Sequence, residues 1–187
     1  GRVPRMMGNE SAAFALLNRG KKVRTLDLKS EADRAKHVPL LQRADILIEQ
    51  FRPGGMARFG LGCDDVHAIN SKLIYCSISG YGQSGPRASE AGHDINYIGL
   101  SGALHGVGRD GRPSPPVNYL GDFGGGGMLL AFAMASALLA VRNGAPGQVI
   151  DCAMTEGSAL LTAFTHGLNA AVQCRGGGGA HVVGRGS

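Results

Sequence analysis

Short apolar segments that alternate with helical ones constrain the fold of this chain most. Residues 44–49 and 73–79 are typical of buried strands, because each is a short, mostly apolar run that ends at turn-forming residues. Residues 22–28 predict an earlier strand, and residues 30–43 predict a helix with Ser30 as its N-cap. Strand, helix and strand in this order make a βαβ unit, which predicts an α/β fold with a parallel, doubly wound sheet.

The rest of the chain continues the alternation. We expect short helices at 56–59 and 64–70, a helix at 94–102, an irregular proline-rich segment at 106–116, a long apolar helix at 126–142, a strand at 148–151 and a last helix at 154–172. The glycine-containing loop at 80–86 leaves the carboxyl end of a strand, where open α/β sheets collect ligand-binding groups. It lacks the GxGxxG spacing, so a nicotinamide cofactor is not expected.

The longest uncharged run, residues 123–141, approaches the length of a membrane span. Four glycines near its start leave only about 14 residues that favour a helix, which is short for a span. We therefore expect a buried helix of a soluble protein and no association with a membrane.

Charge and cysteine content narrow the partners. A net charge of +5 and a pI near 9.3 favour anionic ligands. The basic residues are scattered and are not interleaved with aromatic ones, so we expect no nucleic-acid partner. The four cysteines show neither CxxC spacing nor a metal-ligand pairing with histidine, which predicts free thiols in a reducing compartment, a cytoplasmic location and no metal site; they are Cys63, Cys76, Cys152 and Cys174.

A histidine and a distant aspartate suggest proton-transfer chemistry. His93 is followed directly by Asp94, and Asp122 comes 29 residues after His93, just before four glycines. An imidazole and a carboxylate on opposite faces of one carbon can remove a proton from one side and return it on the other. The alternative is that His93 only satisfies a buried hydrogen bond, as most histidines in such dipeptides do.

Several contiguous phrases resemble the family III CoA-transferase superfamily. They include Ile-Glu-Gln-Phe-Arg-Pro-Gly at 48–54, Ser-Gly-Tyr-Gly-Gln-Ser-Gly-Pro at 79–86 and Gly-His-Asp-Ile-Asn-Tyr at 92–97, with shorter matches at 18–22, 27–29 and 147–151. Within the superfamily they are most similar to the alpha-methylacyl-CoA racemases. The resemblance implies a Rossmann-like large domain in an interlocked homodimer, an acyl-CoA substrate, and no metal or redox cofactor.

The resemblance also implies roles for the two motifs. His93 and Asp122 match the racemase residues that flank C2 of a 2-methylacyl-CoA, where one removes the C2 proton and the other protonates the opposite face of the enolate. The second reading is a CoA-transferase, in which Asp122 attacks the acyl-CoA and passes through a mixed anhydride. His93 favours the racemase, because a transferase needs the carboxylate but not a second acid or base.

Coenzyme A carries phosphates, so its site needs cations. Four basic residues lie in or near the matched motifs, and by resemblance the last two are the better candidates: Arg19, Lys29, Arg52 and Arg58. The alternative for each is a solvated surface charge.

Four further residues are candidates near the reacting centre. Tyr97 can line the thioester pocket or be an ordinary core residue. Asp94 can contact the ligand, orient a neighbour or cap the following helix. The amides of Gly124 and Gly125 can bind the enolate oxygen at a helix start, or these glycines only permit close helix packing.

By comparison with the family, the chain is incomplete. It begins where the family has already completed its first strand and helix, and it stops before the family's small domain. Residues 1–172 then form a partial large domain, and residues 173–187 form a glycine-rich tail without packed structure. A third reading is therefore an inactive fragment that at most binds coenzyme A.

Overall fold

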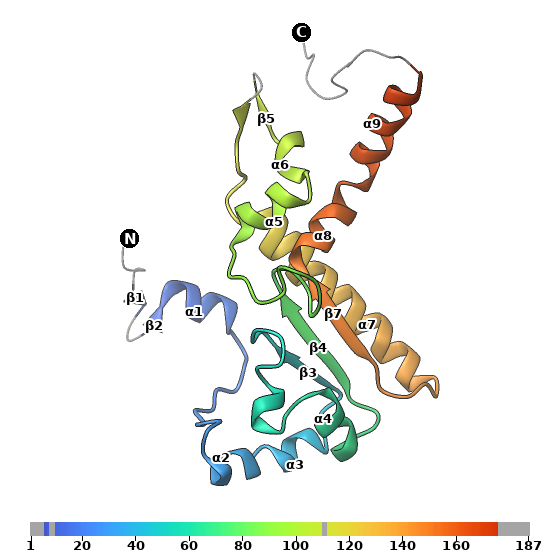
Figure 1. Ribbon diagram of the computed structural model, residues 1–187. Coiled ribbons are helices and arrows are strands. Elements are labelled where there is room, and N and C mark those ends of the chain that lie inside the picture. Colours follow the sequence, from blue (N-terminus) through green and yellow to red (C-terminus); the bar gives the residue numbers. More distant parts are fainter. Residues whose placement is uncertain (1–5, 8–9, 110–111, 176–187) are drawn as a thin grey trace.

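The chain folds around a small parallel sheet, as Figure 1 shows for the computed structural model. The structure describes residues 6–7, 10–109 and 112–175. The expected tail at 173–187 therefore lies mostly outside the described residues. Within them, the expected α/β class with a parallel sheet is confirmed.

β4 (Ile74–Ser79) is the middle strand of the sheet. It pairs in parallel with β3 (Ile46–Glu49) on one side and with β7 (Val149–Ala153) on the other. Its first four residues are all buried. Such a run without polar alternation is typical of a parallel strand that is covered on both faces.

Side chains of β4 alternate between two hydrophobic clusters. Tyr75 lies in the first cluster with Leu41 of α3 (Val38–Leu41) and Val66 of α4 (Cys63–Ile69). The second cluster lies on the other face of the sheet, against α7 (Leu129–Arg142), and contains Ile74, Cys76, Leu130, Ala137 and Cys152. Because successive strand residues point to opposite faces, one strand supports both layers, and helices cover both sides of the sheet as expected.

The strand expected at residues 22–28 is wrong. Residues 21–27 adopt no regular structure, and Val23 is 67% exposed. A strand forms where its backbone groups pair with a neighbour, and in the described chain no strand lies beside this segment. The elements that precede it are β1 (Met6–Met7), β2 (Glu10–Ser11) and α1 (Ala12–Leu17).

The helix expected at residues 30–43 divides into α2 (Glu31–Ala35) and α3. Pro39 explains the break. Its nitrogen has no hydrogen to donate to the carbonyl of Ala35, and its ring would clash with that carbonyl in a continuous helix. The Ser30 N-cap is confirmed, since its hydroxyl accepts the amide N–H of Asp33 at 3.3 Å.

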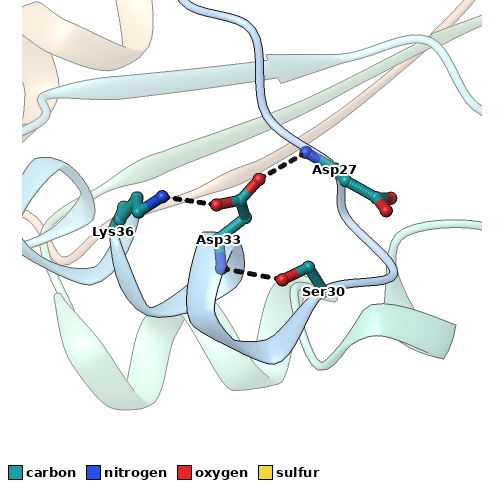
Figure 2. A network of polar contacts seen from close by, with 4 residues as sticks. All are labelled: Asp27, Ser30, Asp33 and Lys36. Carbon is teal, nitrogen blue, oxygen red and sulfur yellow. Dashed lines mark hydrogen bonds and ion pairs between the residues drawn. The ribbon is translucent and has the colours of Figure 1, made fainter.

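Asp33 ties the irregular segment before α2 to that helix (Figure 2). Its carboxylate accepts the amide N–H of Asp27 at 2.9 Å and pairs with Lys36. The hydrogen bond from Lys36 is the largest of the effects that lower the pKa of Asp33. These contacts hold the turn at residues 28–29 in place, at the edge of the sheet.

The remaining helices and strands largely follow the expected order. They are η1 (Ala57–Phe59), α5 (Asp94–Leu100), α6 (Ala103–Gly106), the hairpin of β5 (Gly108–Arg109) and β6 (Arg112–Pro113), the π-helix η2 (Tyr119–Met128), α8 (Met154–Leu161) and α9 (Ala163–Arg175). Three features differ from expectation. The segment expected to be irregular at 106–116 contains a short hairpin, because β5 and β6 pair with each other. The helix expected at 126–142 is preceded by the π-helical turns of η2, and the last helix breaks at Thr162, whose hydroxyl bonds back to the carbonyl of Ser158.

η2 and α8 approach each other closely through glycines. A Cβ atom at Gly125 would lie 2.6 Å from the amide nitrogen of Ser158, and one at Gly157 would collide with the carbonyl oxygen of Gly125. The absence of side chains therefore lets the two backbones touch. Of the two readings for the glycine run, close helix packing is the one that this contact supports at Gly125.

The expectation that the long apolar helix is buried is wrong. On α7 only Leu130 and Ala137 are buried, and Phe132 is 72% exposed. Among the described residues, Tyr119–Arg142 is the one helical stretch that is long and apolar enough to cross a membrane by length and composition. That is weak support for a span, because core helices of soluble proteins have the same length and composition.

The contact between η2 and α8 makes a stability prediction. We expect Gly157→Ala to lower the free energy of unfolding by about 3 kcal/mol, because the new methyl group must push the two helices apart. Urea unfolding of both proteins measures this. Gly167→Ala on α9, where a Cβ meets nothing within 4 Å, is the matched control and should change stability little. Equal stabilities for Gly157→Ala and the parent would contradict the packing argument.

Tyr75 makes stability depend on high pH. Its hydroxyl donates to the carbonyl of Leu61 at 3.1 Å, and burial is the main cause that raises its pKa to about 12. Since an unfolded tyrosine has a pKa of about 10, the stabilisation is complete below pH 10 and is lost as pH rises toward 12. Between pH 9 and 11.5 we expect the loss of stability to be about 2 kcal/mol smaller in Tyr75→Phe than in the parent, and unchanged in Tyr119→Phe. The loss that remains in Tyr75→Phe comes from other buried groups such as Cys76, whose pKa burial raises to about 11. Urea titrations at both pH values test it.

Candidate active site

The two sequence motifs meet at the start of α5. His93 has an extended backbone and immediately precedes this helix, and its side chain is exposed. The amide N–H of His93 donates to Oδ1 of Asn96 at 2.9 Å, so the helix start is closed by Asn96. The imidazole is thus held at a defined point on the chain and faces outward, where a ligand can reach it.

Asp94 connects His93 to Asp122. Its carboxylate is buried, and one oxygen, Oδ2, accepts the amide N–H groups of Gly121 at 2.7 Å and Asp122 at 2.8 Å. Asp94 is thereby joined directly to two residues that lie 27 and 28 positions later in the chain. Of the readings given to Asp94, orientation of a neighbouring segment is the one that its contacts support, whereas Asn96 takes the capping role.

Tyr97 forms the wall behind these motifs. It is 6% exposed and meets Tyr81 edge to face, with ring centroids 5.3 Å apart. Burial raises the pKa of Tyr97, and the charges of Tyr81, Asp122 and Asp94 raise it further. Asp94, whose side chain bonds the amide of Asp122, lies on the same helix as Tyr97, so the two predicted residues are connected through Asp94.

Two glycines make room for the Tyr97 ring. A Cβ atom at Gly80 would collide with the ring, and one at Gly92 would lie 2.7 Å from Tyr97 Cε1. The loop that carries Gly80 is held against the start of α8, because the Thr155 hydroxyl donates to the Gly80 carbonyl at 2.7 Å. Thr155 was not predicted from the sequence, since its role depends on β7 and β4 being neighbours.

A small hollow opens in front of Tyr97 at the carboxyl end of β4. Its volume is about 180 Å³, and its lining includes Arg52, Gly80, Gly92 and Tyr97. Arg52 and Tyr97, predicted separately from the sequence, are thus brought together. Gly92 precedes His93 directly, so this hollow reaches the backbone that carries the predicted acid or base.

A larger, mostly apolar cavity of about 390 Å³ lies beside the hollow. Leu28, Leu41, Leu47, Phe51, Met56 and Leu61 form most of its wall, together with the more polar His37, Glu49 and Gln50. Gln50 and Phe51 line both the cavity and the hollow, so the two are neighbours across these side chains. The sequence offered one signal for this: Gln50 and Phe51 directly follow β3, at the sheet edge where ligands collect.

The other predicted cations, Arg19, Lys29 and Arg58, are not among the residues that line the cavity or the hollow. Lys29 follows the lining residue Leu28, and Arg58 comes two residues after Met56. Both side chains are exposed. Arg19 lies in the turn after α1, and it lines neither the cavity nor the hollow.

The predicted oxyanion donors are less favourably placed. In a π-helix the N–H of each residue bonds to the carbonyl five positions earlier, so the amides of Gly124 and Gly125 are directed along η2. The amides without a partner inside η2 are those of its first five residues, and two of them bond to Asp94. An oxyanion role for Gly124 and Gly125 stays a prediction without support from the packing.

Within the described residues, no group of three His, Cys, Asp or Glu side chains could hold a metal ion.

Comparison with known proteins identifies the family. The profile of CoA-transferase family III matches residues 2–183. The chain belongs to CoA-transferase family III. Its relatives include enzymes of two kinds, so membership of family III does not by itself fix the reaction.

Three known proteins place this family III chain among its relatives. Alpha-methylacyl-CoA racemase of Mus musculus is 46% identical over 79% of this chain and 39% of the racemase. Acetyl-CoA:oxalate CoA-transferase of Acetobacter aceti is 38% identical over 81% of this chain and 39% of the transferase. The crystal structure of a CaiB/BaiF family protein from Brucella suis matches with a TM-score of 0.80 and 31% identity, covering 97% of this chain and 47% of the other. The chain spans about two fifths of the length of these curated relatives.

Proposed function

We propose that this family III chain carries the proton-transfer site of an enzyme that racemises 2-methylacyl-CoA thioesters at C2. One of His93 and Asp122 takes the C2 proton, and the electron pair of the C–H bond moves into the enolate. The other group donates a proton to the opposite face of C2, and the C=C bond of the enolate returns to the thioester. One proton leaves and one is gained, so no co-reactant is needed.

One observation carries this proposal: Asp94 joins the two motifs. His93 is the chain neighbour of Asp94, and the amide of Asp122 is hydrogen-bonded to the Asp94 side chain at 2.8 Å. The two motifs that carry these titratable groups therefore meet at Asp94, near the hollow that Gly92 and Tyr97 line. A two-base mechanism needs two such groups in one site, and this meeting of the motifs supports it.

We further propose that the two neighbouring cavities together hold an acyl-CoA. We place the nucleotide end of coenzyme A in the larger apolar cavity and the thioester in the smaller hollow, with the pantetheine arm passing Gln50 and Phe51. Arg52 lines the hollow, and Arg58 and Lys29 are close in sequence to residues that line the larger cavity, so their guanidinium and ammonium groups are candidates to meet the phosphates. Arg19 is the weakest of the four candidates.

A CoA-transferase is the second candidate, and the acetyl-CoA:oxalate CoA-transferase among the relatives supports it. Asp122 would attack the thioester carbonyl, release the CoA thiolate and leave an aspartyl mixed anhydride. The half-buried setting of Asp122 suits that role as well. A homodimer and a cytoplasmic location stay predictions under either reaction.

Exchange of the C2 proton separates the two reactions. In deuterated water, the protein expressed from its complete gene should exchange the C2 proton of a 2-methylacyl-CoA for deuterium. We expect His93→Ala and Asp122→Asn each to slow exchange by about 10²- to 10⁴-fold, because each removes one acid or base. His105→Ala on α6 is the control and should keep the parent rate. Exchange that survives in His93→Ala would contradict the two-base assignment, whereas trapping of Asp122 by hydroxylamine in the presence of acyl-CoA would support CoA transfer.

Coenzyme A binding tests the cation assignment separately from the chemistry. We expect Arg52→Ala to raise the dissociation constant of free coenzyme A by about 10-fold or more, because a charged hydrogen bond to phosphate is lost. Arg52→Lys should recover part of the affinity. Arg142→Ala, at the far end of α7, is the matched control and should bind like the parent. Titration calorimetry gives the constants, and an unchanged value for Arg52→Ala would make Arg52 a surface charge.

A further inference from the structure

Asp94 is a buried charge without a cation. Asp94 is 4% exposed, and its Oδ1 atom is buried without any hydrogen-bond partner. Buried carboxylates are normally paired, yet neither ion pair of the described residues includes Asp94. Its hydrogen bonds go to the backbone of Gly121 and Asp122.

The carboxylate is not needed to begin its own helix. Asn96 already accepts the amide of His93 at 2.9 Å, so a side chain other than that of Asp94 closes the start of α5. Oδ2 of Asp94 instead serves η2, whose first amides have no partner inside that helix. A negative group at this end also suits the helix dipole.

Gly121 is shaped to this contact. A Cβ atom at position 121 would lie 2.9 Å from Oδ2 and 3.1 Å from Cγ of Asp94. A side chain at this position would therefore displace the carboxylate. Residue 94 and residue 121 fit each other from two separate segments of the chain.

We propose that Asp94 is a positioning residue: its carboxylate holds the backbone at Gly121 and Asp122, and so sets the Asp122 side chain relative to His93. This inference rests on the proposed function. His93 directly precedes Asp94 in the chain, and the amide of Asp122 is hydrogen-bonded to the Asp94 side chain. The positions of both reacting residues therefore depend on a single buried residue. A displacement of about 1 Å between such groups can cost about 10²-fold in rate.

The conservative and the truncating variant of Asp94 should differ. Asp94→Asn keeps an oxygen that can accept both amides, so we expect kcat for C2 exchange within about 5-fold of the parent. Asp94→Ala removes the acceptor, and we expect kcat to fall by about 10²-fold with KM within about 3-fold. Rescue by asparagine and a constant KM are not expected of a group that touches the substrate or acts as an acid.

The contact can be broken from the other side without altering Asp94. Gly121→Ala should lower kcat to a similar degree, because the methyl group excludes the carboxylate. Gly99→Ala on α5 is the matched control, since a Cβ there meets nothing within 4 Å, and it should keep the parent kcat. The double variant Asp94→Ala with Gly121→Ala should be no slower than either single variant, because both remove the same contact.

Amide hydrogen exchange gives a readout that needs no turnover. By NMR, the amides of Gly121 and Asp122 should be protected in the parent and in Asp94→Asn, and should exchange faster in Asp94→Ala. Unchanged kcat in Asp94→Ala, or an Asp94→Asn variant as slow as Asp94→Ala, would overturn the positioning role while leaving the racemase proposal intact. Absence of C2 exchange and of CoA transfer in the parent would overturn the proposed function, and the positioning role with it.

Discussion

The fold depends on β4 being buried on both faces. Alternate residues of this one strand enter separate hydrophobic clusters, so α3 and α4 on one side and α7 on the other pack against the same strand. The two neighbouring strands run parallel to β4, which brings their carboxyl ends to one edge. Every feature of the candidate site that touches the sheet does so at that edge.

The site itself is held mostly by backbone contacts. Glycines at positions 80 and 92 admit the Tyr97 ring, and the Thr155 hydroxyl fixes the first of these loops to the start of α8. Asp94 bonds two amides of η2, and η2 is pressed against α8 where both lack side chains. The reacting side chains can then be few, with His93 exposed and Asp122 half-buried, because the backbone around them is closely packed.

Much of this could be predicted from the sequence, and the failures have physical causes. The strands at 46–49, 74–79 and 149–153 follow from local apolar runs, and the Ser30 cap follows from local chemistry. The strand expected at 22–28 failed because pairing is a property of the neighbours and not of the segment. The π-helical start at Tyr119 could not be foreseen either, since it arises where η2 meets α8 and Asp94. His93, Asp122 and Tyr97 carried chemical signals in the sequence, whereas the walls formed by Gln50 and Phe51 became apparent only from the cavities.

The fit between Asp94 and Gly121 also limits the routes by which such a sequence can diverge. A carboxylate at 94 and any side chain at 121 compete for the same space. A lineage that acquires a larger residue at 121 must therefore already have lost the acid, or lose it soon afterwards. These two positions should therefore change together during descent, although they lie 27 positions apart along the chain.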